Sequence, residues 1–214
     1  MNSPAKQLRE FWDLFGQALE QLRDTETEDL LDQGERLLHA YRKHLREIDT
    51  NLTLNFERNS EEGPMELVFG CDGYPESIHN VLSLVDSAPQ ITGVQVKAFN
   101  ERHYPVPTLV NLGGELCEIG DYWCSLRVIS GRLELAVYLS DSPSISDMDP
   151  RIEAVMILLD ALIGEYEIMT KVWVLDWYPL PVDPLDYGLI PLEELREAFD
   201  AIKHEVKPVG IQLH

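Results

Sequence analysis

The sequence predicts an α+β fold in which two ββαβ units form a mostly antiparallel sheet. The same order of elements (strand, turn, strand, helix, strand) occurs in residues 51–102 and again in residues 123–178. Each occurrence opens on alternating apolar residues, as a half-buried strand does: Leu52, Leu54 and Phe56 in the first, Cys124, Leu126 and Val128 in the second. A turn and a second apolar strand follow in each case, at residues 65–69 and 133–138. The repeated order predicts an internal duplication.

Residues 1–50 predict an N-terminal helical hairpin. Apolar residues recur at helical spacing on both sides of a polar interruption at residues 24–27, where Thr27 is a suitable N-cap. Pro4 fits the first turn of the first helix. The polar amphipathic start differs from a secretory signal peptide, which has a continuous apolar segment.

The helix of each unit is predicted from its end signals. Pro75 and Pro89 enclose an apolar stripe in the first unit. In the second unit Asp149 is a candidate cap, Pro150 fits the first turn, and Gly164 stands where the helix should end.

The remaining segments have less regular sequence patterns, which predict a third strand, a connector and a C-terminal helix. Residues 172–175 are a nearly continuous apolar run, which favours a central strand buried on both faces. The connector, residues 103–122, contains a short apolar piece and is expected to add one or two irregular strands. Residues 179–214 are predicted as a linker followed by a C-terminal helix that Pro191 opens.

Composition restricts the function more than any motif does. The chain has 17 Lys and Arg against 38 Asp and Glu, a net charge of −21 spread along its length. Such a surface repels nucleic acid and anionic lipid, and it favours a basic protein partner. No apolar run reaches the length of a membrane span. Three cysteines without CxxC spacing predict reduced thiols and a cytoplasmic location, and no cofactor motif is found.

Two groups of carboxylates are candidate sites. Asp141, Asp147 and Glu153 lie around the predicted start of the second unit's helix and form the candidate interaction surface. Asp72, in a glycine-rich turn, and the Asp160–Glu165 pair, at the end of that helix, form a weaker candidate site for acid–base chemistry. None of these carboxylates stands in a catalytic or metal-binding motif.

Two further features are candidate contacts. Arg102-His103-Tyr104 is a rare positive segment, for which a salt bridge to one of the abundant carboxylates is the favoured interpretation over an anion site. The aromatic residues of the second unit would line a pocket or an interface, although packing of the strands also explains them: Trp123, Trp173, Trp177 and Tyr178.

Several phrases together resemble an uncharacterised family of bacterial cytosolic proteins. They are residues 51–57, Ala88-Pro89, residues 97–99, residues 158–166 and residues 190–195. Members of that family have phrases such as "NLTFEF", "ADG", "FRPR" and "LDxxLGEYD". This chain departs from the pattern at Cys71, at residues 100–102 and at Glu167. The resemblance implies a bacterial source and the two-unit organisation, and it assigns no catalytic residue.

Two functional hypotheses follow. The first is a non-enzymatic intracellular binding protein that acts through its acidic surface, for example as an inhibitor or immunity-type protein for a basic partner. The second is a hydrolase or small-ligand enzyme that uses the carboxylates near the helix ends. The net charge and the lack of a catalytic motif favour the first.

Overall fold

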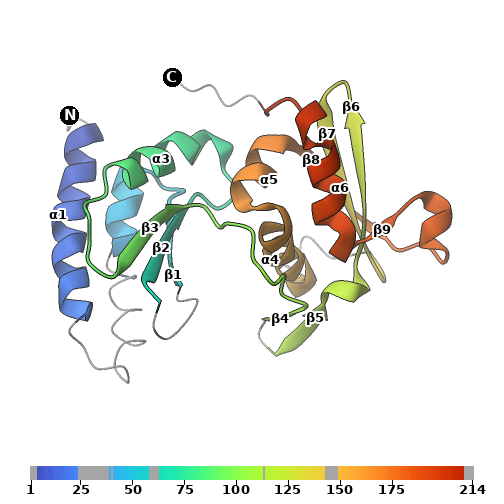
Figure 1. Cartoon of the computed structure of the whole chain (residues 1–214), viewed down its shortest axis with the longest axis horizontal. Helices are drawn as coiled ribbons and strands as arrows, with labels where there is room; N and C mark the ends of the chain where they lie inside the picture. Colours follow the sequence, from blue (N-terminus) through green and yellow to red (C-terminus); the bar gives the residue numbers. More distant parts are fainter. Residues whose placement is uncertain are drawn as a thin grey trace. The chain divides into compact units, whose positions relative to one another are not determined.

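The computed structural model describes residues 4–23, 39, 41–57, 63–112, 114–142 and 149–209. The chain forms two compact units, one within residues 1–99 and the other within residues 100–212 (Figure 1). Both units combine helices with strands, so the α+β class is confirmed, and the N-terminal and C-terminal helices are both present.

The first unit contains a three-stranded sheet in the order β1-β2-β3. Strand β1 (Thr53–Glu57) pairs antiparallel with β2 (Met65–Gly70), and β2 pairs parallel with β3 (Val94–Ala98). The connection from β2 to β3 contains the 3-10 turn η1 (Pro75–Ser77) and helix α3 (Ile78–Asp86). Pro75 begins η1, ahead of the apolar stripe that it was predicted to precede, because its fixed φ suits a first turn.

An aromatic cluster forms the core of the first unit. Helix α1 (Pro4–Arg23) places Phe11 and Trp12 against Phe69 of β2, and Phe15 against both of them, with ring centroids 5.3–6.1 Å apart. The Trp12 indole N–H donates a hydrogen bond of 2.9 Å to the carbonyl of Leu84 in α3, so its polar end is satisfied. Residues 41–48 are also helical, while the predicted turn at residues 24–27 lies outside the described residues.

The second unit contains two sheets. Strands β4 (Leu109–Leu112) and β5 (Glu115–Glu118) pair antiparallel and supply the extra strands expected in the connector. The larger sheet has the order β8-β7-β6-β9. In it β6 (Trp123–Ile129) pairs antiparallel with β7 (Arg132–Leu139) and with β9 (Ile190–Pro191), and β7 pairs parallel with β8 (Val172–Pro179).

The described strands lie in three sheets, which answers a question that the sequence left open, namely whether the two units share one sheet. One prediction about the strands is wrong. Strand β8 lies at an edge of its sheet, rather than in the centre. Leu175 of β8 packs against the core, whereas Trp173 and Val174 face outward. Because the outward residues are also apolar, the sequence of this edge strand has the continuous apolar run that is typical of a strand buried on both faces.

Helices cover one face of the larger sheet. Helix α4 (Pro150–Ile163) is followed at once by α5 (Glu165–Lys171), and α6 (Leu195–Ile202) closes the unit (Figure 1). Buried side chains of α4 and α6 pack against the inward residues of β7, which are every second residue from Leu133 to Leu139. This one-sided burial produces the alternating pattern seen in β7.

The predicted end signals of α4 are confirmed. An Asp149 carboxylate oxygen accepts a hydrogen bond of 3.0 Å from the backbone N–H of Arg151, and Pro150 begins the helix. Gly164 ends it with φ of 90°, a conformation that an L side chain rarely adopts.

Short 3-10 turns connect the remaining elements of the second unit. They are η2 (Ile119–Asp121), η4 (Pro184–Tyr187), η5 (Leu192–Glu194) and η6 (Lys203–Glu205). Cys71, Cys117 and Cys124 are free and buried. None of the helices in the described part of the chain combines the length and apolarity needed to span a bilayer.

We predict that Leu159→Ala lowers the free energy of unfolding by about 2–5 kcal/mol, because Leu159 is fully buried between α4 and the sheet. Ile157→Ala in the same helix is the matched control, since the Ile157 side chain is 41% exposed and should cost far less. Urea denaturation followed by tryptophan fluorescence measures both. Equal midpoints for the two variants would contradict the assignment of the buried face.

Candidate functional site

The carboxyl end of α4 is held by two arginines from other elements. Arg196 of α6 donates from Nε to the carbonyl of Leu162 (2.8 Å) and from Nη2 to the carbonyl of Ala161 (2.6 Å). Arg102 donates from Nε to the carbonyl of Ile163 (3.0 Å). The last carbonyls of a helix have no partner within it and carry its negative dipole end. The two guanidinium groups donate hydrogen bonds to these carbonyls and place positive charge at the negative end of the helix dipole.

Arg196 also binds the segment that enters the second unit. Its Nη2 donates to the carbonyl of His103 (2.8 Å), and its guanidinium lies 4.1 Å from the ring centroid of Tyr104. The backbone N–H of His103 donates to the carbonyl of Ala161 (2.9 Å). Arg196 is only 9% exposed, so its charge is compensated by carbonyl oxygens and an aromatic face within the protein.

Arg102 forms the salt bridge that the sequence analysis favoured for this positive segment. Its Nη1 lies 2.9 Å from Oδ2 of Asp200 in α6, and Lys203 lies 2.8 Å from the other oxygen of that carboxylate. The hydrogen bond from Lys203 and that from Arg102 lower the pKa of Asp200. The cations of this region are therefore used to join α4, α6 and the entering segment.

Asp160 and Glu165 lie on the two sides of Gly164, and the charges of their carboxyl groups interact. Oε2 of Glu165 accepts hydrogen bonds of 2.9 Å from both the backbone N–H and the side-chain amide of Asn100. Burial, and secondly the charge of Glu165, raise the pKa of Asp160 to about 7. One oxygen of the nearby Glu167 is buried without a hydrogen-bond partner.

A carboxyl group with a pKa near 7 can donate or accept a proton at neutral pH, which general acid–base catalysis requires. Structural networks shift pKa values by the same causes, so the shift alone does not define a catalytic site. Here Glu165 is bound to Asn100, and the adjacent helix end is filled by arginines. The arrangement is that of a buried structural junction.

Asp72 belongs to the other unit. It is exposed in the turn after β2, with φ of 49°, and the neighbouring Cys71 thiol lies 3.2 Å from the carbonyl oxygen of Tyr74. The turn has the tight glycine-rich geometry that the sequence indicated. Asp72 lies in the first unit, whereas Asp160 and Glu165 lie in the second.

The start of α4 contains the candidate acidic surface. Arg151 binds Asp149 at 2.6 Å and also binds the exposed Asp141, and these carboxylates raise its pKa. Glu153 is exposed in the first turn of α4, whereas Asp147 lies outside the described residues. Asp141 is therefore partly neutralised, which its sequence position did not indicate. Within the described ranges, no group of three or more His, Cys, Asp or Glu is arranged to hold a metal ion.

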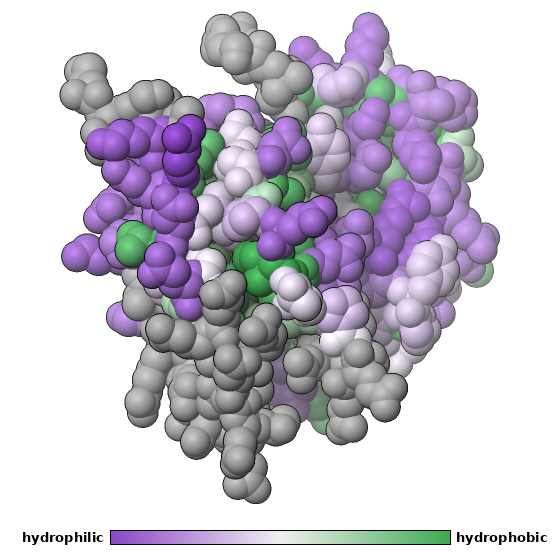
Figure 2. Space-filling view, turned by 60° about the vertical axis from the view of Figure 1, so that its left-hand side comes forward, coloured by the Kyte–Doolittle hydropathy of each residue, from purple (hydrophilic) through white to green (hydrophobic). Residues whose placement is uncertain are grey.

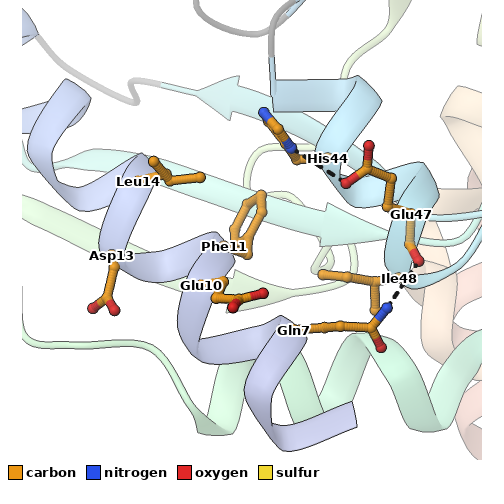
Figure 3. A pocket seen from close by; sticks show the side chains of 8 residues that line it. All are labelled: Gln7, Glu10, Phe11, Asp13, Leu14, His44, Glu47 and Ile48. Atoms are coloured by element: carbon orange, nitrogen blue, oxygen red, sulfur yellow. Dashed lines mark hydrogen bonds and ion pairs between the residues drawn. The ribbon is translucent and has the colours of Figure 1, made fainter. Parts of the chain in front are cut away.

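A pocket of about 500 Å³ opens on the first unit between α1 and the helical residues 41–48 (Figure 3). Phe11 and Ile48 contribute its apolar lining. Polar residues at its rim contact one another: His44 lies 3.5 Å from Glu47, and the Gln7 side-chain amide donates a hydrogen bond to the backbone carbonyl of Glu47. A second pocket of about 320 Å³ lies on another side of α1, beside Trp12 and Pro89. Asp160 and Glu165 line neither of these two pockets.

Comparison with known proteins gives no assignment. No protein-family model matches the chain, and no curated protein or solved structure is significantly similar to it.

Arg196 was missed by the sequence analysis, although the sequence contains a signal for it. Leu192, Leu195 and Phe199 define the apolar stripe of the last helix, and Arg196 occupies a position on that stripe. A charged residue at a core-facing position requires a buried partner. The partners themselves, backbone carbonyls of α4, could not be identified from residue types.

We predict that Arg196→Met lowers the free energy of unfolding of the second unit by roughly 2–4 kcal/mol, because three carbonyl oxygens lose the hydrogen bond that Arg196 donates. Arg196→Lys should recover only part of this loss, since an ammonium group cannot reproduce the planar set of donors. Arg127→Met, at an exposed position of β6, is the control. A stability of Arg196→Met equal to that of the control would exclude the proposed role.

We predict a pH-dependent effect of Asp160→Asn. The pKa of Asp160 rises from 3.8 to about 7 on folding, so the wild type loses stability as pH increases between these values and levels off above them. The variant lacks this loss. Its stability relative to wild type should therefore increase between pH 4 and pH 8 by up to roughly 4 kcal/mol.

Urea denaturation at a series of pH values measures the effect of Asp160→Asn. Glu153→Gln removes an exposed carboxyl group from the same helix and is the control. A difference between Asp160→Asn and wild type that does not change with pH would contradict the raised pKa.

Proposed function

We propose that this protein is a non-enzymatic binding protein that acts through its acidic surface on a basic protein partner, as an inhibitor or immunity-type protein would. The observation that carries the proposal is the use of charge in the second unit. Residues 100–212 contain 8 Lys and Arg against 20 Asp and Glu. The cations with described contacts are bound mainly within the unit itself, which leaves a strongly acidic exterior.

The contacts of three arginines show how the cations are used. Arg196 is buried among carbonyl oxygens, Arg102 joins α4 to Asp200, and Arg151 binds Asp149 and Asp141. Exposed acids such as Glu153 therefore face solvent with little compensating positive charge. Figure 2 shows one face of the molecule, on which hydrophilic side chains predominate. An acidic exterior would steer a basic partner toward it and repel polyanions.

The alternative is a hydrolase or small-ligand enzyme, and the raised pKa of Asp160 is the observation that favours it. It has less support because Glu165, which would be the second catalytic carboxylate, already accepts two hydrogen bonds from Asn100. Burial and the charge of Glu165 account for the raised pKa of Asp160 without a catalytic role.

We also infer that the two units arose by duplication of one ββαβ element. Support comes from the order of pairing: β1 and β6 each pair antiparallel with the next strand, which in turn pairs parallel with the strand after the helix. The sequence repeat places Leu67 opposite Leu135 in the second strands and Val81 opposite Val155 in the helices, and all four side chains are buried. Superposition of the two sets of elements would test this inference.

The binding proposal is tested by capturing partners from source cells at low and at physiological salt, then measuring association and dissociation rates of each purified partner. The association rate should fall by about tenfold or more as salt rises, because exposed charges are screened beyond roughly 8–10 Å. Asp141→Asn with Glu153→Gln should slow association more than it speeds dissociation. Ser142→Asn changes the same exposed loop without changing its charge and is the control.

A partner that associates equally fast at low and high salt would contradict the proposal. Copurification of a small metabolite alone, with no protein, would favour the enzyme alternative.

A further inference from the structure

The loop between β8 and β9, residues 180–189, exposes large apolar side chains. Val182 is 97% exposed, Leu185 is 74% exposed and Tyr187 is 68% exposed. In Figure 1 this loop, which contains η4, projects from the strands of the second unit. Apolar side chains concentrated on one projecting segment are characteristic of a protein–protein contact, because isolated exposed apolar residues are normally scattered.

The loop is built by its own hydrogen bonds. The backbone N–H groups of Asp186, Gly188 and Leu189 donate to carbonyls within the loop, at 3.0–3.2 Å. Gly188 has φ of 69°, which ends η4 in a conformation that favours glycine. Leu189 is buried, and Leu180 donates its N–H to the carbonyl of Leu139, so both ends are fixed to the sheet. A preorganised loop loses less conformational entropy when it binds.

A row of aromatic residues crosses the outward face of the sheet beside this loop. Trp123 of β6, Tyr138 of β7 and Tyr178 of β8 are consecutive partners in the register, and the two tyrosine rings lie 5.6 Å apart. They point away from the helix-covered face because they alternate with its buried residues. The loop leaves the sheet after Pro179 and returns in β9, where Pro191 is the partner of Trp123. The row and the loop therefore form one surface.

The chain segment that contains this loop carries charge of a single sign. The sequence contains no Lys or Arg between Lys171 and Arg196. The acids of that interval are all exposed: Asp176, Asp183, Asp186, Glu193 and Glu194. A second copy docked here in two-fold symmetry would place these acids against their own counterparts. Anionic lipid and nucleic acid would be repelled for the same reason.

We propose that loop 180–189 and the row Trp123–Tyr138–Tyr178 form the docking surface for a protein that offers an apolar groove or helix face bordered by Lys and Arg. This inference rests on the proposed function and adds to it the apolar anchor of the contact. Leu185 and Tyr187 insert into the partner, as buried aliphatic and aromatic side chains do at interface centres, and the surrounding acids meet its basic rim.

The test uses the full chain and a fluorescently labelled amphipathic helical peptide with one leucine face and one lysine face as the probe. Binding is measured by fluorescence anisotropy and mapped by NMR on backbone amides. Leu185→Ser combined with Tyr187→Ser should weaken binding about tenfold or more. Leu116→Ser, at a 60% exposed position of β5, is the matched control and should bind as wild type does. A peptide with the same leucine face and glutamates in place of lysines should not bind.

Equal binding of the probe by wild type and the double variant, or binding of the glutamate peptide, would overturn the inference. So would sedimentation that shows a wild-type dimer lost in the double variant, or loop-dependent binding to phosphatidylglycerol vesicles. With a captured native partner, salt-dependent association that the double variant leaves unchanged would refute this surface and keep the proposed function. Loop-dependent binding that is insensitive to salt would keep the surface and refute the acidic-surface function.

Discussion

The second unit depends on the contact between the Arg196 guanidinium and the carboxyl end of α4. A helix end buried in a protein leaves carbonyl oxygens that water cannot reach, and each must find a donor. Arg196 supplies donors to two of these carbonyls and to the carbonyl of His103 with one planar group. Because Arg196 lies on α6, the same interaction fixes α6, the end of α4 and the entering segment relative to one another.

The turn between α4 and α5 belongs to the same junction. Gly164 turns the chain with positive φ, and a Cβ at this position would lie 3.7 Å from the Arg102 side chain and 3.8 Å from the carbonyl of Asn100. Asn100 then binds Glu165 on the far side of the turn. The cations and the amide are therefore used to build a helix junction.

The sequence was informative where a local rule decides the structure. Pro150, Asp149 and Gly164 predicted the limits of α4 because capping and turn geometry depend on neighbouring residues alone. The edge position of β8 was not predictable, because outward apolar residues such as Trp173 imitate burial on both faces. The Asp160–Glu165 pair was identified from spacing, but its partner Asn100 lies 65 positions from Glu165, and residue types do not reveal such contacts.

The edge position of β8 has a consequence for the behaviour of the protein at high concentration. An edge strand presents backbone donors and acceptors that can recruit a strand from another molecule and begin aggregation. Arg132 lies over the Trp173 ring at 4.0 Å, Asp176 puts a charge in the middle of the strand, and Pro179 ends it without a donor. These three residues are the devices that natural sheets use against edge-to-edge association. Strand β8 can therefore remain at the sheet edge without serving as a template for intermolecular β-sheet.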